Sequence, residues 1–141
     1  MPTTISMMHE FSASAERVFA ALDDSANMGS WLGVKIELIK PAASSGLGAV
    51  RRLHLGLSTI DEEIFERQAP THIVYKIVRG LFPLDHHRGE ITVTAHGADR
   101  AQAVWQIELG SKVPLLESIV GSVLQLAIQR GFVRLDKQLA V

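Results

Sequence analysis

The chain has 141 residues, no cysteine and 47% hydrophobic residues, so we expect one domain with a single core over residues 1–141, without disulfides or thiol nucleophiles. Its 14 Lys and Arg residues nearly balance its 15 Asp and Glu residues, giving a net charge of −1 without any block of like charge. This balance argues against nucleic acid and against an anionic membrane surface as partners.

The first residues, MPTTISMMHEF, lack the basic region and the apolar run of a secretory signal. No segment reaches the roughly 18 uninterrupted apolar residues that a bilayer-spanning helix needs. We therefore expect a cytoplasmic protein with no stable membrane insertion.

The N-terminal quarter predicts one strand followed by short helices. Residues 4–11 alternate in polarity, which places four side chains on one face of a strand: Ile5, Met7, His9 and Phe11. Ser12 or Ser14 offers an N-cap for a short amphipathic helix that turns four apolar residues inward: Ala15, Val18, Phe19 and Leu22. The polar link from Asp24 to Trp31 has room for a second helical turn, with Trp31 as its apolar anchor.

The middle of the chain is strand-like. Residues 34–40 alternate, with Val34, Ile36 and Leu38 on the expected buried face. Five further stretches with a period of two follow, at residues 49–57, 59–68, 72–80, 89–96 and 101–109. Short, turn-rich separators favour antiparallel hairpins, so we expect about seven strands in one antiparallel sheet.

The last segment predicts a long helix that begins near Pro114 and runs for roughly 25 residues, or about 38 Å. Five polar residues form a narrow wet stripe on it: Ser118, Ser122, Gln125, Gln129 and Asp136. Apolar residues cover most of the remainder: Leu116, Ile119, Val120, Val123, Leu124, Ala127 and Ile128. The sheet must therefore wrap this helix. Gly121 and Gly131 either make room for packing or are simply tolerated.

Five short motifs occur in sequence along the chain. They are SASAERVFAALDD followed by Trp31, GLGAVRRL at 46–53, IDEEI at 60–64, VYKI at 74–77 and AVWQIEL at 103–109. Over nearly the entire chain the sequence resembles the START-like (SRPBCC) superfamily, whose helix-grip fold is shared by birch-pollen-allergen-type proteins, lipid-transfer domains and bacterial polyketide cyclase/dehydrase-like proteins. It looks most like the last of these.

The resemblance implies an α+β fold with a curved antiparallel sheet around the long C-terminal helix and two short helices after the first strand. It also implies an apolar cavity between sheet and helix. Trp31 would then lie beside one end of that cavity, although it equally suits a plug in the core.

Strand alternation predicts which polar side chains enter the interior. Arg51 shares its face with Leu53 and Leu55, Glu62 lies with Ile60 and Ile64, and His87 lies with Gly89 and Ile91. The same rule leaves Arg52, Asp61 and Glu63 outside. Wall area would come from Tyr75, Ile77 and Trp105, and from Val123 and Ala127 on the helix.

An inward arginine and glutamate on adjacent strands predict a pair, because an unpartnered buried charge is very unfavourable. The pair is either a structural ion pair or a polar anchor for a ligand. His87 is either a satisfied histidine or an acid/base, and His9 also has the parity of the cavity face. Adjacent strand residues point in opposite directions, so His86 and His87 do not suit one metal ion, and no other metal-ligand set is evident.

Two functions remain open. One is binding or transport of a small hydrophobic molecule such as a lipid, polyketide, sterol or aromatic compound, without a cofactor. The other is a polyketide cyclase or dehydratase type of enzyme that uses Glu62 or His87 for proton transfer. The apolar residues Leu81, Phe82 and Leu84 form a gate, a dimer contact or a loop packed on its own domain, so the protein is expected to be a monomer or a homodimer.

Overall fold

The computed structural model describes residues 3–140, in which seven strands and a few short helices precede one long helix. The elements in chain order are β1 (Thr3–Phe11), α1 (Ala15–Asp23), η1 (Ser25–Asn27, a 3-10 turn), α2 (Gly29–Leu32), β2 (Lys35–Lys40), β3 (Val50–Leu55), β4 (Ser58–Gln68), β5 (His72–Arg79), β6 (Leu84–Ala95), β7 (Ala101–Ser111) and α3 (Leu116–Leu139). This order confirms the α+β helix-grip prediction.

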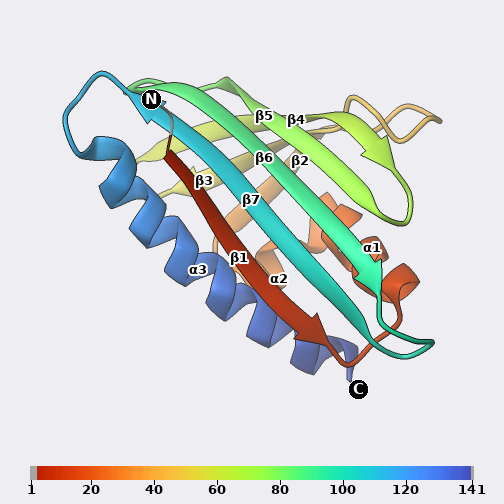
Figure 1. Cartoon of the computed structure of the whole chain (residues 1–141). Coiled ribbons are helices and arrows are strands. Elements are labelled where there is room, and N and C mark those ends of the chain that lie inside the picture. The colour runs from red at the N-terminus through yellow and green to blue at the C-terminus, as the bar shows by residue number, and fades with distance from the viewer. Residues whose placement is uncertain (1–2, 141) are drawn as a thin grey trace.

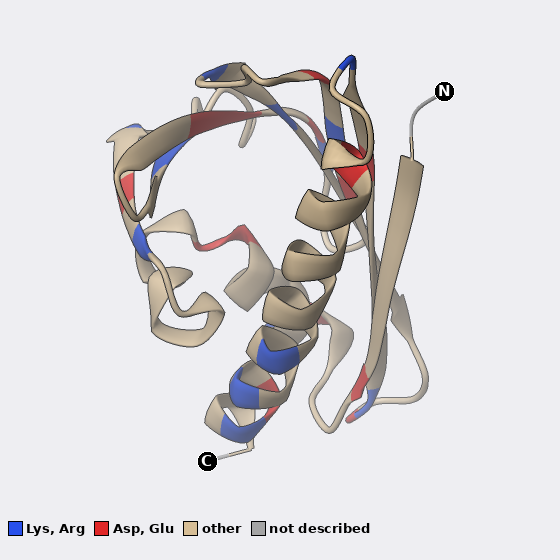
Figure 2. Ribbon diagram, turned by 90° about the vertical axis from the view of Figure 1, so that its left-hand side faces the viewer, with Lys and Arg blue, Asp and Glu red and all other residues tan. Residues whose placement is uncertain are grey.

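The strands form a single sheet in the order β1-β7-β6-β5-β4-β3-β2, and every neighbouring pair is antiparallel. Figure 1 shows α3 lying along β1 on the concave side of the sheet, while α1 and α2 sit beneath the opposite end. Seen from the side, the sheet is strongly curved and bends over toward the long C-terminal helix (Figure 2). Within the described residues, no helix is both long and apolar enough to span a bilayer.

Helix α1 follows the sequence pattern closely. The side-chain oxygen of Ser14 accepts a hydrogen bond from the backbone N–H of Arg17 at 3.3 Å, which makes Ser14 the N-cap. The predicted face of α1 is buried, and it consists of Ala15, Val18, Phe19 and Leu22. The helix therefore covers the end of the sheet with the face that its periodicity predicts.

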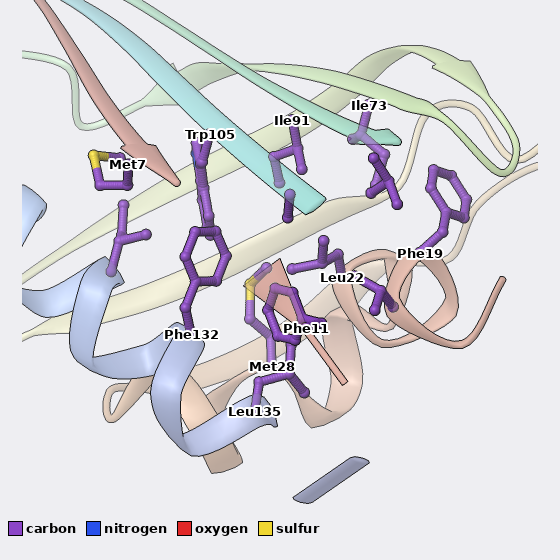
Figure 3. Close-up of a cluster of buried hydrophobic side chains, with 14 of the residues drawn as sticks. Met7, Phe11, Phe19, Leu22, Met28, Ile73, Ile91, Trp105, Phe132 and Leu135 are labelled. Atoms are coloured by element: carbon purple, nitrogen blue, oxygen red, sulfur yellow. The ribbon is translucent and has the colours of Figure 1, made fainter. Parts of the chain in front are cut away.

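The main core lies between the C-terminal half of α3 and the sheet. Phe132 packs edge-on against Phe11, with ring centroids 5.5 Å apart, and also contacts Trp105 (Figure 3). Gly131 lets α2 approach α3, because a Cβ there would lie 3.2 Å from a ring carbon of Trp31. A Cβ on Gly121 would similarly lie 3.1 Å from Ile5. Both glycines thus have a packing role.

Three predictions about the elements need correction. Helix α3 begins at Leu116 rather than at Pro114, because Leu115 adopts a left-handed conformation with φ 66° that interrupts the helix. Ile119 and Val123 on α3 are 60% and 64% exposed, so the rest of the protein does not cover all of the apolar surface of this helix. Leu38 is 44% exposed because β2 is an edge strand with a neighbour on one side only.

Candidate functional site

A cavity of about 420 Å³ lies between the inner face of the sheet and α3. Strands β3 to β7 supply most of one wall, and α3, the segment around α2 and the loop before β6 supply the rest. Apolar side chains dominate the lining, with few polar groups among them. The residues bordering the cavity are Met28, Leu32, Val34, Arg51, Leu53, Leu55, Ser58, Ile60, Glu62, Tyr75, Ile77, Gly80, Leu81, Phe82, Pro83, Leu84, His87, Trp105, Ile107, Leu109, Leu116, Val120, Val123, Leu124, Ala127 and Ile128.

Arg51 and Glu62 form a buried ion pair in the wall. They are direct partners in the β3–β4 register, and Nε of Arg51 donates to Oε1 of Glu62 at 3.0 Å. Only 1% of Arg51 and 6% of Glu62 is exposed. Burial raises the pKa of the Glu62 carboxyl, while the charge and hydrogen bond of Arg51 oppose that rise. The structure therefore confirms the cross-strand pair, in which the two side chains bind each other.

Tyr75 lies beside this pair and is held by two neighbours. Trp105 Nε1 donates a hydrogen bond of 2.8 Å to the Tyr75 hydroxyl, and the guanidinium carbon of Arg51 lies 4.8 Å from the centre of the Tyr75 ring. Gly89 faces Tyr75 across β5 and β6, where a Cβ would lie 2.1 Å from Cζ of the ring. Burial and the charge of Glu62 raise the pKa of Tyr75, so its hydroxyl keeps its proton.

His87 completes the polar part of the wall. Its ring centre lies 5.5 Å from that of Tyr75, and within the described residues its buried Nδ1 has no hydrogen-bond partner. Burial lowers the pKa of His87 to about 4, and the nearby charges of His86 and Arg51 act in the same direction. The imidazole is thus neutral at pH 7. We call Arg51, Glu62, Tyr75 and His87 the polar cluster.

Ten of the eleven residues predicted as ligand contacts border this cavity. They are Arg51, Leu53, Leu55, Glu62, Tyr75, Ile77, His87, Trp105, Val123 and Ala127. Trp31 does not border the cavity, because it packs within the core, edge-on to Trp105 at 6.4 Å and against Gly131. Trp31 therefore fills space in the core, which is one of the two roles that the sequence suggested for it.

His9 and Asp61 also differ from the predictions. His9 does not border the cavity, because Nε2 of its ring bonds the Asp136 carboxylate at 2.9 Å at the side of the fold. Asp61 lies on the outer face as predicted, yet it is buried, because Arg52 and Arg79 cover it with hydrogen bonds of 2.8 and 2.9 Å. These two arginines hold the pKa of the Asp61 carboxyl well below its usual range.

Strand alternation did not predict several other residues of the cavity wall. Leu32 reaches the cavity from the end of α2 and Met28 from the position just before α2, whose four residues are too few for a helical periodicity to be read. Leu81, Phe82 and Leu84 border the cavity from the loop before β6 and from its first residue. Their apolar character was visible in the sequence, but their place at the cavity depends on the curvature of the sheet. Phe82 borders the cavity and is 91% exposed, so we take the mouth of the cavity to lie beside it.

The outer face of β6 carries a different chemistry from the cavity face. His86 points away from the cavity, and its Nε2 lies 3.0 Å from Oε1 of Glu108. His87, the next residue, borders the cavity. The two rings are therefore on opposite sides of the sheet, as the alternation predicts, and cannot bind one ion together.

Comparison with known proteins agrees with this architecture. A family model described as polyketide cyclase / dehydrase and lipid transport matches residues 2–140. No curated protein matches the sequence significantly.

Solved structures share the fold at low sequence identity. A START superfamily protein from Mycobacterium smegmatis has a TM-score of 0.80 and 14% identity, with 97% of each chain covered. A protein from Thermobifida fusca has a TM-score of 0.78 and 20% identity, covering 96% of this chain and 92% of that one. Norcoclaurine synthase from Thalictrum flavum, solved with dopamine and hydroxybenzaldehyde, has a TM-score of 0.70 and 16% identity, covering 96% and 88%.

The family match spans nearly the whole chain, and the sheet, the two short helices and the long terminal helix have the arrangement of the START fold. The chain therefore belongs to the polyketide cyclase / dehydrase and lipid transport family, with a START-like helix-grip fold.

Proposed function

We propose that this protein binds a small hydrophobic molecule in the cavity between the sheet and α3. The observation that carries the proposal is the cavity itself: about 420 Å³ of space with a mostly apolar wall and a few convergent polar side chains. Sites for small molecules commonly enclose about 300–1,000 Å³ and combine these two kinds of surface. Lipids, polyketides, sterols and aromatic compounds are the ligand classes that suit such a wall.

The mouth of the cavity supports the same proposal. Phe82 before β6, Leu55 at the end of β3 and Val123 on α3 border the cavity and are all exposed. Three separate segments thus supply apolar side chains that border the cavity and are also open to solvent. An apolar ligand that enters here stays in contact with apolar surface on its way inward, which lowers the barrier to entry.

The family and its structural neighbours support a ligand-binding role. The family description includes lipid transport, and norcoclaurine synthase holds two small aromatic molecules in a related fold. Fold alone does not identify a ligand, because one fold hosts many functions. The cytoplasmic location and the monomeric or homodimeric state stay predictions from the sequence.

An enzyme of the cyclase or dehydratase type is the second candidate. The neutral His87 imidazole and the Glu62 carboxyl both border the cavity, and both can hold or accept a proton. With a pKa of about 4, His87 would act as a base at pH 7, not as an acid. This role is tested by turnover of the bound molecule, once it is identified, in Glu62→Gln and His87→Phe proteins.

Cavity filling tests the binding proposal. Ala127 borders the cavity on α3, whereas Gln125 on the same helix is exposed and does not. The purified wild type, Ala127→Trp and Gln125→Trp proteins would be compared by native mass spectrometry, followed by extraction and identification of any small molecule. We expect a bound hydrophobic molecule in the wild type and Gln125→Trp proteins, and its loss in Ala127→Trp. Equal retention by all three proteins would contradict binding in this cavity.

A further inference from the structure

Some hydrogen-bond donors of the polar cluster remain free after the hydrogen bonds within the cluster are formed. A guanidinium has five N–H groups, and the hydrogen bond resolved for Arg51 uses Nε alone. The Tyr75 hydroxyl accepts from Trp105 and still carries its own hydrogen. Both side chains border the cavity. The cluster can therefore donate to a ligand oxygen that enters the cavity beside it.

His87 provides the complementary acceptor. A neutral imidazole has one N–H and one nitrogen with a free lone pair. Nδ1 is buried and has no hydrogen-bond partner among the described residues, so the other ring nitrogen, Nε2, is the one left for a ligand. With the proton on Nδ1, the lone pair of Nε2 can accept from that ligand. A ligand at the cavity edge of the ring thus meets an acceptor.

The charges of the cluster favour an uncharged ligand. Arg51 and Glu62 carry opposite charges and bind each other at 3.0 Å, and Tyr75 and His87 are neutral at pH 7. A charged ligand group would leave one charge unbalanced in a buried site, which is strongly unfavourable. A hydroxyl can donate to His87 and accept from Arg51 or Tyr75 without carrying a charge.

We propose that the cavity selects an uncharged hydrophobic molecule with a hydroxyl group, bound with the hydroxyl at the polar cluster and the apolar body toward the mouth. The inference rests on the binding role proposed above and adds the chemistry and orientation of the ligand. The hydroxyl donates to Nε2 of His87 and accepts from the guanidinium of Arg51 or the hydroxyl of Tyr75. The body contacts the apolar wall supplied by β3 and α3.

A matched set of probes separates these features. Naphthalene, 2-methoxynaphthalene, 2-naphthol and 2-naphthoate share one ring system and differ in donor, acceptor and charge. Titrations at pH 7 would follow tryptophan fluorescence, because Trp105 borders the cavity, with isothermal calorimetry as the second readout. We expect 2-naphthol to bind about tenfold more tightly than 2-methoxynaphthalene, which accepts but cannot donate. We expect 2-naphthoate to bind most weakly.

Three histidine variants test whether His87 causes this preference. His87→Phe keeps an aromatic ring without the acceptor and is expected to abolish the tenfold preference for 2-naphthol. His86→Phe changes the neighbouring histidine on the outer face and is expected to keep the preference. His87→Gln retains an acceptor and is expected to restore part of it. Circular dichroism melting curves verify that each variant is folded before it is titrated.

The outcomes distinguish the inference from the binding role. Equal affinities of the wild type for 2-naphthol and 2-methoxynaphthalene would overturn the hydroxyl inference and leave the binding role standing. A tighter complex with 2-naphthoate would overturn the uncharged class, and a preference that survives in His87→Phe would overturn the role of that residue. Failure of all four probes to bind would overturn both proposals.

Discussion

The buried Arg51–Glu62 ion pair should make the stability of the protein sensitive to the loss of either member alone. Both side chains are almost fully buried, and the resolved hydrogen bond between them joins Nε of Arg51 to Oε1 of Glu62 at 3.0 Å. We consider Glu62→Leu, Arg51→Met and the double variant. Removing one member of a buried ion pair typically costs about 3–5 kcal/mol, whereas replacing both members by apolar residues is often neutral.

The two single variants should differ because the remaining charges differ chemically. In Glu62→Leu the Arg51 guanidinium stays charged at every accessible pH, so we expect the full loss of about 3–5 kcal/mol. In Arg51→Met the Glu62 carboxyl can become neutral by binding a proton, because burial raises its pKa. We therefore expect a smaller loss at pH 5 than at pH 7.

The sign of the pH effect follows from that raised pKa. A carboxyl whose folded-state pKa exceeds its unfolded value of about 4.3 holds its proton more tightly in the native state. Its contribution to stability is fully present below the unfolded pKa and is lost as pH rises through the folded pKa. The Arg51→Met protein should lose up to about 1.4 kcal/mol per pH unit within that window.

Urea unfolding at pH 5, 6 and 7, followed by tryptophan fluorescence, measures these differences. We expect the free energy of unfolding of the double variant to lie within about 1 kcal/mol of the wild-type value, and Glu62→Leu to be the least stable protein at pH 5. A Glu62→Leu protein destabilised by less than about 1 kcal/mol, the range of solvent-exposed pairs, would refute the argument from burial.

Three further predictions concern single residues. His87 is neutral in the folded state with a pKa of about 4 and has an unfolded value near 6.5, so stability should fall as pH drops from 6.5 to 4. Urea unfolding should show the wild type losing about 3 kcal/mol more than His87→Phe over that window. Gly89→Ala should destabilise by about 1–3 kcal/mol and change the near-ultraviolet circular dichroism of Trp105, because the new methyl group displaces the Tyr75 ring. Asp61→Asn should lower the free energy of unfolding at pH 7 by about 2 kcal/mol and flatten its decline in acid, because the lowered pKa of Asp61 gives stability that is lost as pH falls; an unchanged acid profile would contradict this.

Much of the architecture was predictable because alternation in a strand assigns faces without knowledge of the fold. The period of two put Arg51, Glu62 and His87 on the inner face, and all three border the cavity. The N-cap at Ser14 and the buried face of α1 followed from equally local rules. The family resemblance then supplied the long-range arrangement that local rules leave open.

The errors arise where burial depends on tertiary shape. Ile119 belongs to an apolar stretch of α3, yet it is 60% exposed. Asp61 has outward parity, yet two arginines from β3 and β5 enclose it. His9 has inward parity, but its strand lies beside α3, where Asp136 binds it. Periodicity gives the direction of a side chain and does not give what lies in that direction.

A crystal structure of the protein with 6-bromo-2-naphthol tests the central claim most directly, because the anomalous signal of bromine fixes the orientation of the ligand. We expect bromine near the mouth beside Phe82 and the hydroxyl oxygen within hydrogen-bond distance of His87 and of Arg51 or Tyr75. A ligand bound outside the space between the sheet and α3, or an interior closed by side chains with no bromine peak, would contradict the claim.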